Sequence, residues 1–152
     1  MVKIENHDNR CFLHSVACHF VGSQNNFTSN PSVYNRFIED SLNYSEQDSP
    51  MDIINIQCFE ERNKKHKIMV NVFFLDHQFG VFTAYTSKMP YSLKSANIIN
   101  LLFTHTEKGG HYFYIKNINH FFRKLIVRRK ILILNNFIVE DVFHIFHHQN
   151  YY

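Results

Sequence analysis

Apolar residues recur every three or four positions through the first 66 residues of the chain, which is the spacing of one helical face. The pattern predicts a helix over 9–21, with Asp8 or Asn9 as its N-cap and Gly22 just after its end. A second helix is expected to begin at the Asn-Pro pair of 30–31.

A third helix is expected after the polar stretch 43–49. The run SPMD at 49–52 has the spacing of a capping box and places proline at the first helical position. The basic run 63–66 would end this helix. Cys58 falls inside it, and we expect its side chain to pack in the core beside Cys18.

After residue 66 the apolar period changes to alternation, which is typical of strands. The segments 67–75 and 79–85 predict one hairpin, and 97–105 and 111–117 predict a second. A short helix, a strand and a terminal helix are expected to follow at 119–130, 130–134 and 137–149.

Helices first and strands afterwards indicate a single α+β domain over residues 1–152. We expect N-terminal helices packed on a mostly antiparallel sheet, with the core at about 8–125 and a C-terminal extension at 126–152. Hydrophobic residues make up 45% and aromatic residues 16% of the chain, which is enough for a sizeable core and excludes a disordered polypeptide.

The net charge of +3 compels neither a nucleic acid nor a membrane as a partner. Basic residues are dense at 123–130, but we interpret this patch as a solvated helix end and do not expect nucleic-acid binding. No apolar run approaches the roughly 20 residues of a membrane span. Three cysteines make no disulfide framework, so we expect an intracellular protein, cytoplasmic or nuclear, in a reducing compartment.

Cys11 lies in the first turn of the first predicted helix. Unpaired backbone N–H groups and the positive end of the helix dipole favour the thiolate there, and the same N–H groups can hold an oxyanion. Most lone cysteines are instead buried structural residues, and position alone favours that interpretation of Cys11.

His111 changes this balance, because it begins a predicted strand directly after Gly109 and Gly110. A turn of small residues lets a substrate backbone approach. A cysteine nucleophile also needs a general base, which usually comes from a distant part of the chain. With 11 histidines in the chain, a structural role for His111 is as readily expected as a catalytic one.

The remaining histidines and the glycines suggest no cofactor. His144 and His148 are four residues apart in the terminal predicted helix and could share a metal. Because no third ligand lies at a useful spacing, we interpret them as a solvated helix face. Four glycines in the whole chain argue against a nucleotide site.

Two segments together are similar to known thiol proteases. The run DNRCFLHS at 8–15 resembles the D-x-x-C-[LF]-x-x-[SA] nucleophile box of ovarian-tumour-type cysteine proteases. The run GHY at 110–112 resembles the His-Tyr strand start of papain-like deubiquitinases.

Residues 8 to about 125 resemble, more closely, a segment carried by Maverick/Polinton-type transposable elements. The matching motifs are N-x-C-F-L-x-S at 9–15, F-E-x-x-N at 59–63, V-N-V-F at 70–73, I-N-L-L at 99–102 and H-Y-x-x-I-K-N at 111–117. Such segments are similar to the viral tegument-like deubiquitinases, which are papain-fold thiol proteases that cleave after the C-terminal glycine of ubiquitin.

This resemblance implies a papain-like fold and thiol-dependent hydrolysis of the isopeptide or peptide bond after ubiquitin. Cys11 would be the nucleophile and His111 the base. Asp8 or Asn9 would lie near the oxyanion site. The expected substrate-binding residues are Gly109, Gly110 and Tyr112, and the expected partners of the arginines of the ubiquitin tail are Glu39, Asp40 or Asp48.

The third, orienting residue departs from the family pattern. The herpesvirus tegument enzymes carry Asp two residues before the histidine, where this chain has Gly109. Asn117 lies six residues beyond His111, roughly 20 Å along an extended strand, which is too far for contact unless the chain bends. Asp76 can reach His111 if their strands are neighbours, so we prefer Asp76 and keep Asn117 as the alternative.

The C-terminus also departs from the pattern. Related transposon proteins continue into a zinc knuckle, but the comparable positions here are Leu134, Phe137, His148 and Tyr152. Because the thiols are absent, we predict no zinc and no other cofactor. Two alternatives to the deubiquitinase stay open: a protease for a ubiquitin-like or other peptide substrate, and a non-catalytic binding module from a mobile-element protein that uses the 123–130 patch.

Overall fold

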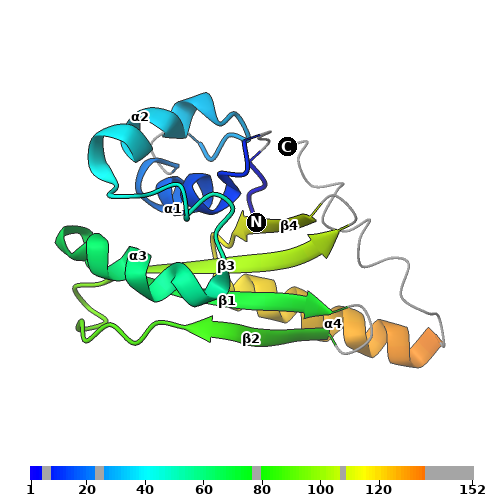
Figure 1. Ribbon diagram of the computed structural model, residues 1–152. Helices are drawn as coiled ribbons and strands as arrows, with labels where there is room; N and C mark the ends of the chain where they lie inside the picture. Colours follow the sequence, from blue (N-terminus) through cyan, green and yellow to red (C-terminus); the bar gives the residue numbers. More distant parts are fainter. Residues whose placement is uncertain (5–7, 23–25, 77–79, 107–108, 136–152) are drawn as a thin grey trace.

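The computed structural model describes residues 1–4, 8–22, 26–76, 80–106 and 109–135. A four-stranded sheet forms the middle layer, and helices lie on both of its faces (Figure 1). Two of the three helices near the N-terminus lie on one face, the third packs on their outer side, and the last helix crosses the other face. The domain is therefore α+β, as the order of the sequence patterns predicts.

The helices are α1 at Cys11–Val21, α2 at Ser32–Ser41, α3 at Ile56–Arg62 and α4 at Ile118–Asn135. Short 3₁₀ turns, η1 at Ile53–Asn55 and η2 at Lys64–His66, flank α3. Gly22 follows α1 and donates its backbone N–H to the carbonyl of Cys18, which confirms the predicted end of the first helix.

The strands are β1 at Ile68–Asp76, β2 at Gly80–Thr86, β3 at Asn97–Thr106 and β4 at Gly109–Tyr114, in the spatial order β2-β1-β3-β4. Both predicted hairpins are present as the antiparallel pairs β1–β2 and β3–β4. The central pair, β1–β3, is parallel, so the sheet is mixed. The connection 87–96 returns the chain to the start of β1, where the Asn97 N–H donates to the Lys67 carbonyl, and β3 then runs beside β1.

Strand alternation divides the core into two parts. Ile68, Val70 and Val72 of β1 point to α1 and α3, while Leu75 points to α4. Burial of each such side chain stabilises the fold by about 1.5–3 kcal/mol. Beside Leu75, the α4 side is formed by Leu102, Ile115 and Phe121.

The start of α1 differs from the expectation. The helix begins at Cys11 with Arg10 in the N-cap position, and no side chain caps it. Asp8 instead accepts the Arg10 N–H at 3.1 Å, which forms the turn that leads into the helix. The predicted N-cap, Asp8 or Asn9, was therefore wrong by one or two residues.

The predicted capping box at 49–52 was also wrong. Asp52, rather than Ser49, is the cap, and its side chain accepts the Ile54 N–H at 3.2 Å. The helical segment that follows Asp52 begins with the tighter η1 turn and continues as α3. Cys58 of α3 is exposed, so the expected pairing with Cys18 is wrong; the buried Cys18 lies 3.7 Å from the Tyr34 hydroxyl.

The strand predicted at 130–134 does not form, because α4 continues through this segment to Asn135. Extending a helix adds one hydrogen bond for each residue ordered, whereas a new strand needs a partner strand. The terminal helix predicted at 137–149 lies outside the described residues.

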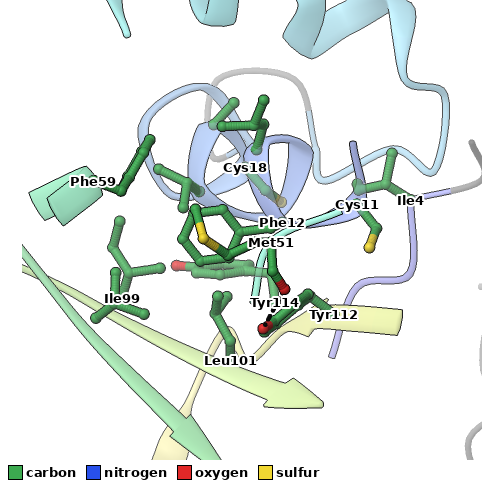
Figure 2. Close-up of a cluster of buried hydrophobic side chains, with 14 of the residues drawn as sticks. Ile4, Cys11, Phe12, Cys18, Met51, Phe59, Ile99, Leu101, Tyr112 and Tyr114 are labelled. Atoms are coloured by element: carbon green, nitrogen blue, oxygen red, sulfur yellow. Dashed lines mark hydrogen bonds between the residues drawn. The ribbon is translucent and has the colours of Figure 1, made fainter. Parts of the chain in front are cut away.

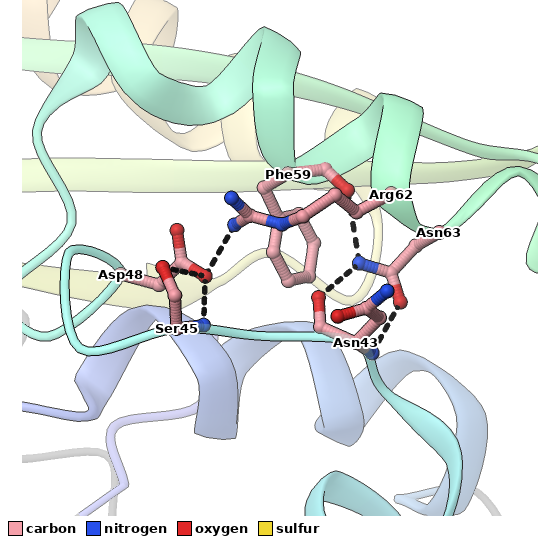
Figure 3. A network of polar contacts seen from close by, with 6 residues as sticks. All are labelled: Asn43, Ser45, Asp48, Phe59, Arg62 and Asn63. Atoms are coloured by element: carbon pink, nitrogen blue, oxygen red, sulfur yellow. Dashed lines mark hydrogen bonds and ion pairs between the residues drawn. The ribbon is translucent and has the colours of Figure 1, made fainter.

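Buried polar contacts hold the loop between α2 and α3 (Figure 3). The Asp48 carboxylate pairs with the Arg62 guanidinium and accepts the Ser45 N–H. The Asn63 side chain exchanges two hydrogen bonds with the backbone of Asn43, at 2.8 and 2.9 Å. Asp48 is 1% exposed, so this carboxylate serves the fold and is not open to a substrate arginine, contrary to our expectation.

Candidate active site

Cys11 is the first residue of α1 and is almost fully buried, with 6% of its surface exposed. Figure 2 shows its sulfur directed toward β4, beside Ile4 and Tyr112 at the margin of the main core. Phe12 anchors this end of α1, because its ring packs edge-on against Phe59 and Tyr112 at centroid distances of 5.1 and 5.3 Å.

Tyr112 lies on the outer strand of the sheet, and its backbone groups point away from β3. The Val2 backbone pairs with Tyr114 on the same outer side, at 2.8 and 3.0 Å, and residues two apart in a strand point the same way. The Ser15 hydroxyl donates to the Tyr112 carbonyl at 3.2 Å, although the two residues are 97 positions apart in the sequence. The Tyr112 N–H faces the Cys11 thiol.

The surroundings of Cys11 favour the neutral thiol. Burial is the largest effect and raises its pKa, and the negative charge of Asp8 adds to the increase. The N–H groups of Tyr112, Phe12 and Cys11 itself act in the opposite direction and lower the pKa. The resting site therefore holds a protonated thiol among donors that would stabilise a negative charge.

His111 precedes Tyr112 in β4, and its side chain points to the other face of the sheet. Its ring contacts Phe113 at 4.8 Å between centroids, and Phe113 packs toward α4. Burial, with the nearby charge of Lys3, lowers the pKa of His111 to about 4, so the imidazole is neutral at pH 7. Its Nε2 atom is buried and has no hydrogen-bond partner.

Cys11 and His111 therefore meet at one edge of the sheet without a hydrogen bond to His111 Nε2. The link between them is the peptide N–H of Tyr112, which is bonded to His111 and faces Cys11. The Cys11 side chain thus reaches the backbone next to His111, while the imidazole lies on the α4 side of the strand.

The structure does not bring Asp76 or Asn117 beside His111. Asp76 ends β1, which is separated from β4 by β3, and alternation directs its side chain to the α1 side, opposite to His111. The Asn117 side chain accepts the His120 N–H at 2.9 Å and so caps the start of α4.

Thr104 is the side chain that sequence reasoning missed. The β3–β4 register places it directly opposite His111 on the same face, and it is 7% exposed. No local motif marks Thr104, because only strand pairing makes it a neighbour of His111.

The two expected oxyanion residues lie in the turn before α1, and both are exposed. Asn9 has a positive φ of 56°, while the Asp8 carboxylate carries a charge that would repel an oxyanion. The backbone N–H groups at the start of α1 are better suited to this role. Asp40 pairs with Arg36 at the exposed surface of α2, and Glu39 beside it is exposed as well.

The expected substrate-binding residues lie at the start of β4. Gly109 has φ of +108°, a conformation that favours glycine, and it is exposed. Gly110 packs against the Phe103 ring, where an added Cβ would lie 2.4 Å from a ring carbon. Gly110 is exposed, but the Phe103 ring fills the space that a side chain there would need, and Tyr112 is 2% exposed.

Among the described residues, no group of three or more His, Cys, Asp and Glu side chains could hold a metal ion. His144 and His148, and the zinc-knuckle positions Phe137, His148 and Tyr152, lie outside the described residues. Of the 123–130 patch, Arg123 is exposed, while the side chains beyond residue 126 are not described. In the described part of the chain, no helix is long and apolar enough to cross a membrane.

The fold and the site thus define an α+β domain with a buried thiol at a helix start and a histidine on the adjoining edge strand. No family model, curated protein or solved structure matches this chain. The functional argument therefore depends on the site itself and on the motifs of the sequence.

Proposed function

We propose that this chain is a papain-like cysteine protease that removes ubiquitin, with Cys11 as the nucleophile and His111 as the general base. One observation carries the catalytic part: the fold brings the first residue of α1 against the peptide N–H that follows His111. The substrate class comes from the resemblance of the 8–15 and 110–117 segments to deubiquitinases.

In this mechanism the neutral imidazole takes the thiol proton as the sulfur attacks the carbonyl carbon of the scissile bond. The same proton passes to the leaving amine, and a water molecule then hydrolyses the thioester. The N–H groups at the start of α1 face the charge that develops on the carbonyl oxygen.

The His111 ring has to turn from Phe113 toward the outer edge of β4 for this transfer. Its Nε2 atom has no hydrogen bond to break among the described residues, and the turn gives up the ring contact with Phe113. In the resting site the thiol and the imidazole are both neutral, so no ion pair draws the ring toward the sulfur. We therefore expect substrate binding to favour the turned rotamer.

A ubiquitin probe with a C-terminal electrophile tests the proposal. We expect the probe to label the wild-type chain once, to spare Cys11→Ala, and to label Cys58→Ala as efficiently as the wild type. Cys58 is a suitable control because its thiol is exposed and lies on α3, away from β4. Absence of labelling at micromolar probe, or equal labelling of Cys11→Ala, would refute the proposal.

Probes built on ubiquitin-like modifiers test the identity of the substrate independently of the thiol-protease mechanism. Labelling of Cys11 by such a probe, and not by the ubiquitin probe, would keep the thiol protease and replace its substrate. The His111→Ala variant is expected to lose labelling at neutral pH, because no other base adjoins the thiol in the mechanism.

A further inference from the structure

Tyr112 is held by α1 through its backbone rather than by a strand. Its carbonyl accepts the Ser15 hydroxyl at 3.2 Å in a buried setting, and its N–H faces the Cys11 sulfur. In an extended strand the N–H and C=O of one residue point the same way, so one neighbour can engage both. Helix α1 is that neighbour.

The spacing of Cys11 and Ser15 suits this arrangement. Residues four apart in a helix lie on one face, with their Cβ atoms about 5–6 Å apart. Ser15 is fully buried, and its hydroxyl has the Tyr112 carbonyl as its partner. The two side chains therefore engage the N–H and the C=O of one peptide segment.

We propose that Ser15 is a positioning residue for the nucleophile: its hydroxyl fixes Tyr112 against α1 so that the Tyr112 N–H is directed at the Cys11 sulfur. The functional meaning of this inference rests on the proposed function, but the ionisation of Cys11 can be measured without any substrate.

The consequence for the thiol follows from simple electrostatics. An N–H that donates to sulfur stabilises the thiolate and opposes the effects of burial and of Asp8, both of which raise the pKa of Cys11. Loss of the Ser15 hydroxyl leaves the Tyr112 carbonyl without this donor and releases the backbone of β4 from α1. The N–H then drifts from the sulfur, and the thiolate loses stabilisation.

The test is an NMR titration of ¹³Cβ-labelled cysteine in the full chain, with the Cys11 signal assigned by its absence in Cys11→Ala. In Ser15→Ala, we expect the pKa of Cys11 to rise by about half a unit or more, roughly a threefold fall in its acid constant. The exposed Cys58 thiol, in the same spectra, is expected to titrate unchanged.

Val16→Ala is the matched control, because Val16 lies on α1 and is as fully buried as Ser15. This substitution removes core volume but leaves the hydrogen bond between Ser15 and Tyr112 in place. We expect it to lower stability while the Cys11 titration stays at the wild-type position. Ser15→Thr retains a hydroxyl and is expected to titrate closer to the wild type than Ser15→Ala does. An unchanged Cys11 titration in Ser15→Ala, or an equal shift in Val16→Ala, would overturn the inference.

The outcome is distinguishable from that of the proposed function. A shifted titration in a chain that the ubiquitin probe does not label would support the positioning role and refute the deubiquitinase. If the probe labels the wild-type chain but the Cys11 titration is unshifted in Ser15→Ala, the deubiquitinase is supported and the positioning role of Ser15 is refuted.

Discussion

On one face of the sheet, α1 and α3 each place a side chain against a strand N–H that has no partner in a neighbouring strand. At one junction, Glu60 of α3 accepts the Val70 N–H of β1 at 2.7 Å, just beyond the point where pairing with β2 ends. At the other, Cys11 of α1 faces the Tyr112 N–H on the outer edge of β4.

The acceptors differ in strength. Glu60 also accepts the Tyr85 hydroxyl at 2.8 Å, and the Ser87 side chain adds a third donor, so the carboxylate ties α3 to β1 and β2. Cys11 offers a thiol, which is a weak acceptor. The same backbone N–H requirement is thus met by a carboxylate at α3, which stabilises the fold, and by a weakly accepting thiol at α1, which is the nucleophile of the proposed function.

The largest effect is expected from Glu60→Ala. This change leaves the Val70 N–H and the Tyr85 hydroxyl without their buried acceptor, which should lower the free energy of unfolding by about 3 kcal/mol. Urea denaturation measures the loss. Glu61→Ala, one residue on and exposed, is the control and should change stability by less than about 0.5 kcal/mol. Equal losses in the two variants would show that Glu60 is not the structural anchor.

Gly110→Ala tests the β4 junction by steric means. The added methyl group would meet the Phe103 ring at 2.4 Å, and we expect a loss of about 2 kcal/mol. The double variant with Phe103→Leu removes the ring and should recover part of that loss relative to Phe103→Leu alone. Additive losses in this double-mutant cycle would contradict the contact.

Tyr112→Phe removes one hydroxyl from the same junction. This hydroxyl donates to the Met51 carbonyl at 3.1 Å in a buried setting, so its loss should cost about 1 kcal/mol. Tyr44→Phe is the control, because the Tyr44 side chain is exposed. If both variants unfold at the same urea concentration as the wild type, the Tyr112 hydroxyl does not hold the 43–52 loop.

The two regions should differ in the sign of their pH dependence. Burial raises the pKa of Glu60 above its ordinary value of 4.5, so the folded state binds the proton more tightly, and stability falls as pH rises from 4.5 through that raised pKa. Burial lowers the pKa of His111 from 6.5 to about 4, so stability falls as pH drops from 6.5 toward 4.

Unfolding free energies of two variants between pH 4 and 8 check these signs. Relative to the wild type, Glu60→Gln should gain stability as pH rises, and His111→Gln should gain stability as pH falls. Flat difference curves would contradict both pKa shifts. A reversed slope would show that the pKa of that group is shifted in the opposite direction.

Local patterns predicted the parts of the fold that form from neighbouring residues. The first helix ends at Gly22 as expected, and the hairpins β1–β2 and β3–β4 arise from alternating segments joined by short turns. The helix starts at Arg10 and Asp52 were missed. No side chain caps α1, and the side chain that caps η1 lies three residues beyond the predicted Ser49, so the local pattern placed both boundaries a few residues early.

The long segment 118–135 shows why the rest of the fold could not be predicted locally. The run KILIL is rich in β-branched and aliphatic residues and predicts a strand, but in the structure it continues the helix α4. The same limit applies to the orienting residue: Asp76 satisfies a sequence argument, whereas the strand order puts β3, with Thr104, next to His111.

The sequence by itself determined the candidate nucleophile and base, because a thiol at a helix start and a histidine after two glycines are local features. It determined the α+β class for the same reason, since period and turn residues are encoded in short segments. Only the tertiary structure decided that the Cys11 thiol faces the Tyr112 N–H, next to His111, and that the imidazole points to the α4 face. Both depend on the parallel pairing of β1 with β3 and on the alternation of β4, which are set by contacts between distant parts of the chain.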